Sequence, residues 1–135
     1  MKPTARRQAR ELALQILFPT EFATHISVRA LIEALGESPE SDASHYAELL
    51  VKGVQDNKAA IDGKIQASSA HWKMDRMATI DRNILRIAVY EMKFATEQIK
   101  ENIAINEAVE IAKKYGTTES ASFVNGLLDQ VSKAH

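Results

Sequence analysis

Apolar residues recur every three or four positions along most of this chain, and no stretch alternates between apolar and polar residues. The first spacing places apolar side chains on one face of an α-helix, whereas alternation is the pattern of a half-buried β-strand. The spacing is clearest over residues 80–95, where Ile84, Ile87 and Met92 share one helical face. The sequence therefore predicts an all-α fold.

About seven helices are expected in the chain, which has 135 residues and should form a single domain, residues 1–135. The first six cover residues 4–18, 25–35, 45–56, 58–69, 80–95 and 104–115, and Thr118 or Ser120 caps the seventh. Leu49, Leu50 and Val54 should point inward from the third.

Several residues are expected to mark helix ends. Pro19 should end the first helix, because proline lacks the amide donor for the next backbone bond. Gly36 and Gly116 should stop two others. Asn125-Gly126 ordinarily signals a hairpin turn, but the apolar residues on both sides of it fit a helix better. We expect Gly126 to let a neighbouring helix approach closely.

The composition argues against several classes of site. The chain has no cysteine, which removes disulfides, thiolate metal sites and cysteine nucleophiles. The four histidines lack the spacing of a two-histidine metal site; they are His25, His45, His71 and His135. There is no glycine-rich phosphate loop and no serine nucleophile motif. We therefore expect no enzymatic activity, metal or cofactor.

No segment approaches the ~20 apolar residues that cross a bilayer, and no apolar signal core follows the basic start of the chain. We expect a cytoplasmic protein without a membrane partner.

Positive charge gathers at the amino end, although the net charge is only -1. Four basic residues precede the first acidic one, namely Lys2, Arg6, Arg7 and Arg10. At 100° per residue, Lys2, Arg6 and Arg10 lie on one side of a helix. Their side chains are expected to project outward, where guanidinium groups suit phosphate contacts. A frayed basic terminus that only improves solubility fits the spacing equally well.

Charge alone would bind a nucleic acid weakly. Four cations on single-stranded RNA make log affinity fall as log salt rises, with a slope of about 3 in magnitude at most. Base stacking or a second protein would have to add affinity. Phe123 and Trp72 are the candidate stacking residues, although both kinds of side chain are more often part of the core.

The second half of the first helix is apolar on nearly all sides, because the sector of Arg6 and Arg10 continues into Leu14, Leu17 and Phe18. Such a segment is either buried or meets a partner protein, and we favour burial.

Glu91 falls among the apolar positions of residues 80–95. A buried carboxylate needs a partner, for which Arg76 or a helix N-terminus near Asn102 is available. We expect a structural role.

Four segments of the chain resemble the NusB family, in order and with natural spacing. They are RRQARELALQ at 6–15; Trp72 and DRM at 75–77, followed by IDRNILRIAVYEM at 80–92; INEAVEIAK at 105–113; and FVNGLLD at 123–129. The resemblance covers nearly the whole chain and leaves residues 23–44 unmatched.

The resemblance implies two small helical bundles packed together and a role in transcription antitermination. NusB-like proteins bind the boxA element of ribosomal RNA transcripts with a small-subunit ribosomal protein that acts as NusE. The pair then joins other Nus factors on RNA polymerase.

The resemblance also implies site residues. RNA contacts map onto Arg6, Arg7 and Arg10, and onto Glu119 and Phe123 at the start of the last helix, while Lys2 joins this set through its place in the basic cluster. The ribosomal-protein surface maps onto Phe18, Phe22 and Asp81, and Pro19 should reshape it.

Two alternatives remain. One is a helical protein-protein adaptor that never touches RNA. The other is the NusB-like domain of ribosomal RNA methyltransferases, which we disfavour because 135 residues are too few to include the methyltransferase part. The oligomeric state is left open.

Overall fold

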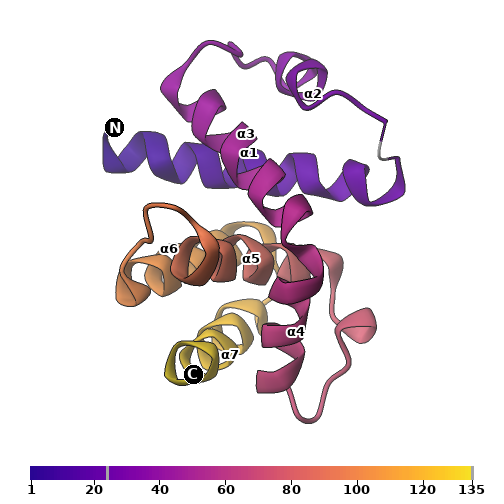
Figure 1. The fold of residues 1–135 in the computed structure, drawn as a ribbon, viewed down its shortest axis with the longest axis vertical. Coiled ribbons are helices and arrows are strands. Elements are labelled where there is room, and N and C mark those ends of the chain that lie inside the picture. Colours follow the sequence, from indigo (N-terminus) through magenta and orange to yellow (C-terminus); the bar gives the residue numbers. More distant parts are fainter. Residues whose placement is uncertain (24, 135) are drawn as a thin grey trace. The chain divides into compact units, whose positions relative to one another are not determined.

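The computed structural model describes residues 1–23 and 25–134, which form seven α-helices and no strand (Figure 1). The predicted all-α fold is confirmed. The helices are α1 (Pro3–Phe22), α2 (Val28–Ala34), α3 (Asp42–Asp56), α4 (Lys58–Ser68), α5 (Thr79–Val89), α6 (Glu101–Tyr115) and α7 (Ser120–Lys133). A 3₁₀ turn, η1 (Met74–Arg76), precedes α5, and a π-helical turn, η2 (Tyr90–Phe94), follows it. No helix among these is long and apolar enough to cross a membrane.

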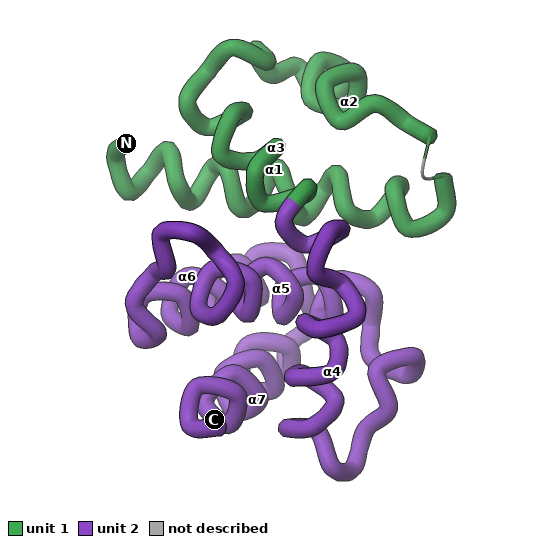
Figure 2. The backbone as a smooth tube through the Cα atoms, in the orientation of Figure 1, with its two compact units in different colours: residues 1–52 green, residues 53–135 purple. Residues whose placement is uncertain are grey.

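The chain divides into two compact units, residues 1–52 and 53–135 (Figure 2). Unit 1 contains α1, α2 and most of α3. Unit 2 contains the end of α3 and all the later helices, among which α5, α6 and α7 pack against one another and α4 packs on α5 and α7. Two small helical bundles were expected from the family resemblance.

Helix α1 does not end at Pro19, which corrects the expectation from the sequence. The helix runs on to Phe22, and the amide of Ala23 donates to the carbonyl of Pro19 at 3.1 Å. Proline removes one backbone donor, but near the end of a helix few bonds remain to be lost. The buried Thr20 hydroxyl donates to the carbonyls of Ile16 and Leu17, so the last turn is closed partly by a side chain.

Helix α2 is shorter than expected, and its two ends have clear local causes. Ser27 caps its start by accepting a hydrogen bond from the amide of Ala30. Gly36 ends it in the left-handed conformation, with φ at 81°. The amides of Gly36 and Glu37 donate back to Glu33 and Ile32, which is a Schellman motif. The predicted glycine stop is confirmed.

The core of unit 2 lies between α5 and its neighbours. Helix α5 is buried on nearly all sides from Asn83 to Val89, and Leu85 packs there with no exposed surface. From α7, Val124 and Leu128 are also fully buried. The segment around Asn125 and Gly126 is helical, as the apolar spacing predicted.

Some expectations about individual residues are wrong. Leu49 is half exposed, because α3 buries Ala47, Leu50 and Val54 on its inner face instead. Gly126 is exposed, and a Cβ added there would meet nothing within 4 Å, so no neighbouring helix needs this glycine.

The start of α7 also differs from the expectation. The helix begins after Glu119, and neither Thr118 nor Ser120 is its cap. Ser120 is the first helical residue, and its hydroxyl accepts from the amide of Thr117 instead. Gly116 does follow the last residue of α6, as predicted.

The close approach that a glycine permits occurs at Gly53 instead. A Cβ at Gly53 would lie 2.2 Å from Cζ of Tyr90, so the tyrosine ring occupies the space that any other residue would fill. Tyr90 is buried at the start of the π-helical turn.

Candidate functional site

The amino end of α1 presents a cationic surface. Pro3 occupies the first helical position, where its missing amide costs nothing. Lys2 is exposed, and Arg6 and Arg7 are partly exposed. The Arg6 guanidinium lies 5.4 Å from the centroid of the Tyr46 ring, a cation–π contact between α1 and α3 within unit 1. Guanidinium donors lie in the plane of the group, so stacking on Tyr46 occupies a face and leaves in-plane donors for an anion.

Arg10 does not project outward, which corrects the expectation for this residue. Only 3% of its surface is exposed. One turn after Arg6, the same side of α1 passes from solvent into the interior, and helical periodicity alone does not reveal where that change occurs. The cationic surface of α1 therefore consists of Lys2, Arg6 and Arg7.

The apolar second half of α1 is partly buried and partly exposed. Leu14 and Leu17 are buried, as favoured from the sequence. Phe18 and Phe22 are 48% and 75% exposed, so for Phe18 the burial interpretation is wrong. Their rings meet edge to face, with centroids 5.5 Å apart. Because α1 continues through Pro19, these two residues stand four positions apart on one helix face.

A second candidate site is a pocket of about 210 Å³ in unit 2. It lies between the η1 segment and the first turns of α5 and α7. The lining residues are Trp72, Arg76, Met77, Ala78, Asp81, Glu119 and Phe123. The pocket thus brings together four residues singled out from the sequence as candidate RNA or partner contacts, namely Trp72, Asp81, Glu119 and Phe123, and adds Arg76.

The exposure of Trp72 overturns the expectation that it belongs to the core, because 55% of its surface is exposed. Large aromatic side chains are usually mostly buried, and the polar residues around it, such as Lys73 and Asp75, were the available signal of a surface segment.

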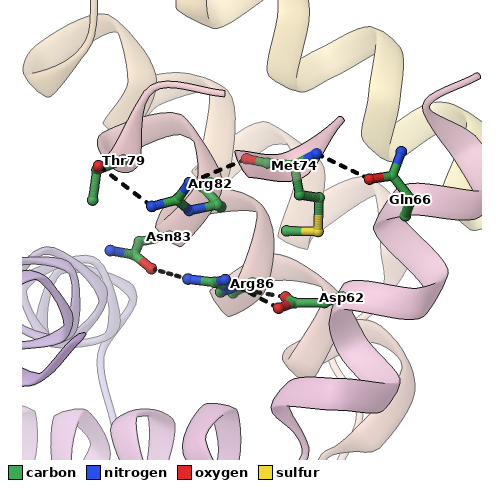
Figure 3. A network of polar contacts seen from close by, with 7 residues as sticks. All are labelled: Asp62, Gln66, Met74, Thr79, Arg82, Asn83 and Arg86. Atoms are coloured by element: carbon green, nitrogen blue, oxygen red, sulfur yellow. Dashed lines mark hydrogen bonds and ion pairs between the residues drawn. The ribbon is translucent and has the colours of Figure 1, made fainter. Parts of the chain in front are cut away.

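The backbone that carries Trp72 is tied to the helices beside it. The Gln66 side chain of α4 donates to the Trp72 carbonyl at 2.9 Å and accepts from the Met74 amide at 2.9 Å. The Ser69 hydroxyl also donates to the Trp72 carbonyl, at 3.0 Å. From α5, Arg82 donates to the Met74 carbonyl at 3.1 Å (Figure 3). The exposed indole therefore extends from a backbone segment that these hydrogen bonds hold in place.

An ion pair between a buried arginine and a partly exposed aspartate supports the same region. Arg86 of α5 makes a two-point contact with Asp62 of α4, at 2.8 and 3.0 Å, and a further hydrogen bond to Asn83 (Figure 3). Such planar, paired contacts fix orientation as well as distance. The wall of the pocket formed by α5 is therefore anchored to α4.

The pocket wall contains charges of both signs. One carboxylate oxygen of Asp81, Oδ1, is inaccessible to solvent and has no hydrogen-bond partner in the structure. Glu119 is exposed and accepts from the Thr117 hydroxyl at 3.3 Å. Arg76 supplies the cation. The Asp81 and Glu119 carboxylates that line the pocket can accept hydrogen bonds from a ligand.

Glu91 and the histidines, which the sequence analysis also considered, are not part of these sites. Glu91 is 1% exposed, which confirms its predicted burial. The identity of its partner stays a prediction. His25, His45 and His71 are exposed and widely separated in sequence, and His135 lies outside the described residues. Among the described residues, no group of three or more His, Asp or Glu side chains is arranged to hold a metal ion.

Comparison with known proteins places the chain in a family. The family model described as the NusB family matches residues 7–133. The chain belongs to the NusB family. It is 72% identical over its full length, and the full length of its relative, to a protein of Bdellovibrio bacteriovorus named transcription antitermination protein NusB. A protein of the same name from Myxococcus xanthus is 45% identical, with 96% of each chain covered.

Solved structures of NusB proteins share the fold. NusB of T. maritima superimposes with a TM-score of 0.82 at 34% identity, covering 100% of this chain and 94% of that one. A chain from the crystal structure of antitermination factors NusB and NusE in complex with dsRNA gives a TM-score of 0.85 at 26% identity, covering 99% and 100%.

Proposed function

We propose that this protein is a transcription antitermination factor that binds boxA-containing RNA of ribosomal RNA transcripts together with the small-subunit ribosomal protein that acts as NusE. The observation that carries the proposal is the match of the whole chain to NusB proteins, one of them solved with NusE and RNA. In this proposal the chain recruits other Nus factors and RNA polymerase, acts in the cytoplasm, catalyses no reaction, and uses residues 1–135 as one RNA-binding domain.

Lys2, Arg6 and Arg7 bind RNA phosphates in this proposal. Their exposure at the start of α1 supports it, as does the absence of any acidic residue in the first turn. Arg10 belongs to the same set by family resemblance, but its buried guanidinium needs a local rearrangement before it can reach a phosphate.

Glu119 and Phe123 contact the RNA at the start of α7, and Phe18, Phe22 and Asp81 contact the ribosomal protein. The exposed pair of phenylalanine rings supports a protein-binding role at the end of α1, because exposed apolar side chains that contact one another favour a partner surface.

Titration of a boxA-containing single-stranded RNA, with and without the ribosomal protein, tests the proposal. We expect weak binding by the chain alone and clear strengthening by the partner. Arg6→Ala and Arg7→Ala should weaken RNA binding in both cases. Arg10→Ala is a poor test, because loss of a buried charged side chain also destabilises the fold.

An unrelated RNA of the same length is the control for specificity, and equal affinity for it would contradict the boxA assignment. The adaptor alternative predicts a different result: binding of the ribosomal protein with no dependence on RNA, on Arg6 or on Arg7. Phe18→Ala with Phe22→Ala should weaken partner binding while leaving the weak binding of RNA alone unchanged.

A further inference from the structure

The pocket in unit 2 selects its occupant by charge. Asp81 and Glu119 place two carboxylates in its wall, which repel a phosphate group. Arg76 lies in the same wall and disfavours a lysine or arginine side chain of a partner. A neutral group that donates hydrogen bonds is left as the best match, because the Asp81 and Glu119 carboxylates that line the pocket can accept from it.

The volume and the apolar surface of the pocket further restrict the kind of ligand that fits it. Its volume of about 210 Å³ is below the roughly 300 Å³ at which pockets for drug-sized ligands begin, so it suits a single ring system. Trp72 and Phe123 supply the aromatic surfaces. A flat, neutral ring system with hydrogen-bond donors on its edge describes an unpaired nucleobase.

We propose that Trp72 and Phe123 form a pocket that takes one unpaired base of the bound RNA, with Asp81 accepting a hydrogen bond from the edge of that base. This rests on the proposed RNA-binding function and adds Trp72 as an RNA-contacting residue. It also gives Asp81 a contact to RNA.

The way the chain holds Trp72 supports a binding role. An exposed indole on a mobile loop would lose conformational freedom on binding, which lowers affinity. Here Gln66 and Ser69 fix the backbone at Trp72, and Arg82 fixes it two residues later. The backbone that carries the ring is therefore held in advance, which lowers the entropy cost when a base stacks on the ring.

The sequence provides a direct probe, because Trp72 is its only tryptophan. Titration of the full-length protein with boxA-containing single-stranded RNA should change the tryptophan emission in parallel with binding measured on labelled RNA. Trp72→Ala should weaken RNA affinity by about 5- to 100-fold, as expected for loss of one base–aromatic stack. Trp72→Phe should retain most of the affinity.

Ile103→Ala is the matched control, because Ile103 is an exposed apolar residue of unit 2 outside the pocket. It should bind RNA as the wild type does. Single abasic substitutions along the RNA then locate the base. One position should cost the wild type at least as much as Trp72→Ala does, and should cost the Trp72→Ala variant clearly less than it costs the wild type.

Three results would overturn the base pocket. The first is that Trp72→Ala binds RNA as tightly as the wild type, and the second is that saturating RNA leaves the tryptophan emission unchanged. Alternatively, Trp72→Ala weakens binding of the ribosomal protein in the absence of RNA, which makes the pocket a protein site. The proposed function fails by a separate result, namely that the wild type binds no RNA with or without the partner.

Discussion

At the scale of single residues, the contact between Gly53 and Tyr90 sets how closely α3 approaches the end of α5. The tyrosine ring fills the position that a Cβ would occupy. Gly53→Ala should therefore lower the free energy of unfolding by about 1–3 kcal/mol, because overpacking of a buried contact outweighs the gain in helix propensity. Urea unfolding of the purified protein measures the change.

Gly63→Ala is the matched control, because Gly63 also lies inside a helix but a Cβ there meets nothing within 4 Å. It should raise the free energy of unfolding by about 0.5–1 kcal/mol, the ordinary preference of a helix for alanine. If both substitutions stabilise the protein, the packing explanation for Gly53 is wrong.

Tyr90 should make stability fall at high pH. Burial, together with the negative charges of Glu91 and Asp56, raises the pKa of Tyr90 above its ordinary value of 10.0. The folded protein then holds the phenol proton more tightly than the unfolded chain does. The stability that depends on this proton is complete below pH 10.0 and is lost as pH rises through the raised pKa.

The measurement is the difference in free energy of unfolding between the wild type and Tyr90→Phe at pH 8 and pH 11. The other two tyrosines are present in both proteins, so their effects cancel in this difference. The wild type should lose more stability than Tyr90→Phe between the two pH values. Equal losses would show that Tyr90 titrates normally.

At the scale of elements, the ends of helices follow local chemistry where the ending residue acts alone. Gly36 stops α2 because its positive φ is unfavourable for residues with a Cβ. Pro19 is a different case, since packing of α1 carries the helix past a residue that opposes it locally. Local signals therefore predicted the end of α2 and mispredicted the end of α1.

Gly36→Ala should destabilise the protein by about 1–2 kcal/mol through backbone strain alone, since the added Cβ meets nothing within 4 Å. Gly36→Asn should cost less, because asparagine tolerates the left-handed conformation better than alanine does. Thermal unfolding of both variants checks the order. The reverse order would argue against a conformational origin.

At the scale of the whole molecule, the net charge is -1, although a cationic surface lies at the start of α1. That surface has three side chains and not four, because Arg10 is buried. Contacts from Lys2, Arg6 and Arg7 to single-stranded RNA, at ~0.7 each, give a slope of log affinity against log salt of about 2. Affinity measured from low to physiological salt should show this shallow dependence.

Variants distinguish the phosphate contacts of the proposed interface from its base-stacking contact. Arg6→Ala should reduce the slope by about 0.7 and weaken binding to all RNAs alike, as loss of one phosphate contact does. Trp72→Ala should leave the slope unchanged, because stacking releases no counterions. A slope well above 3 would mean that Arg10 and further cations reach the RNA.

The sequence by itself determined the helical class, most of the helix positions and the family, because apolar spacing and local stop residues act over a few positions at a time. It also pointed to Asp81, Glu119 and Phe123, although it did not reveal that they share a pocket. The helix positions depend on residues that are close in sequence. The family and these site residues follow from sequence motifs that occur in the same order as in NusB proteins.

Only the tertiary structure decided which side chains are accessible. Arg10 was expected to be exposed but is buried, and Trp72 was expected to be buried but is exposed. Periodicity gives the direction in which a side chain leaves its helix, but exposure depends on whether another segment covers that direction. The segments that bury a side chain are distant from it in sequence. Its exposure therefore depends on tertiary packing and not on the local sequence pattern.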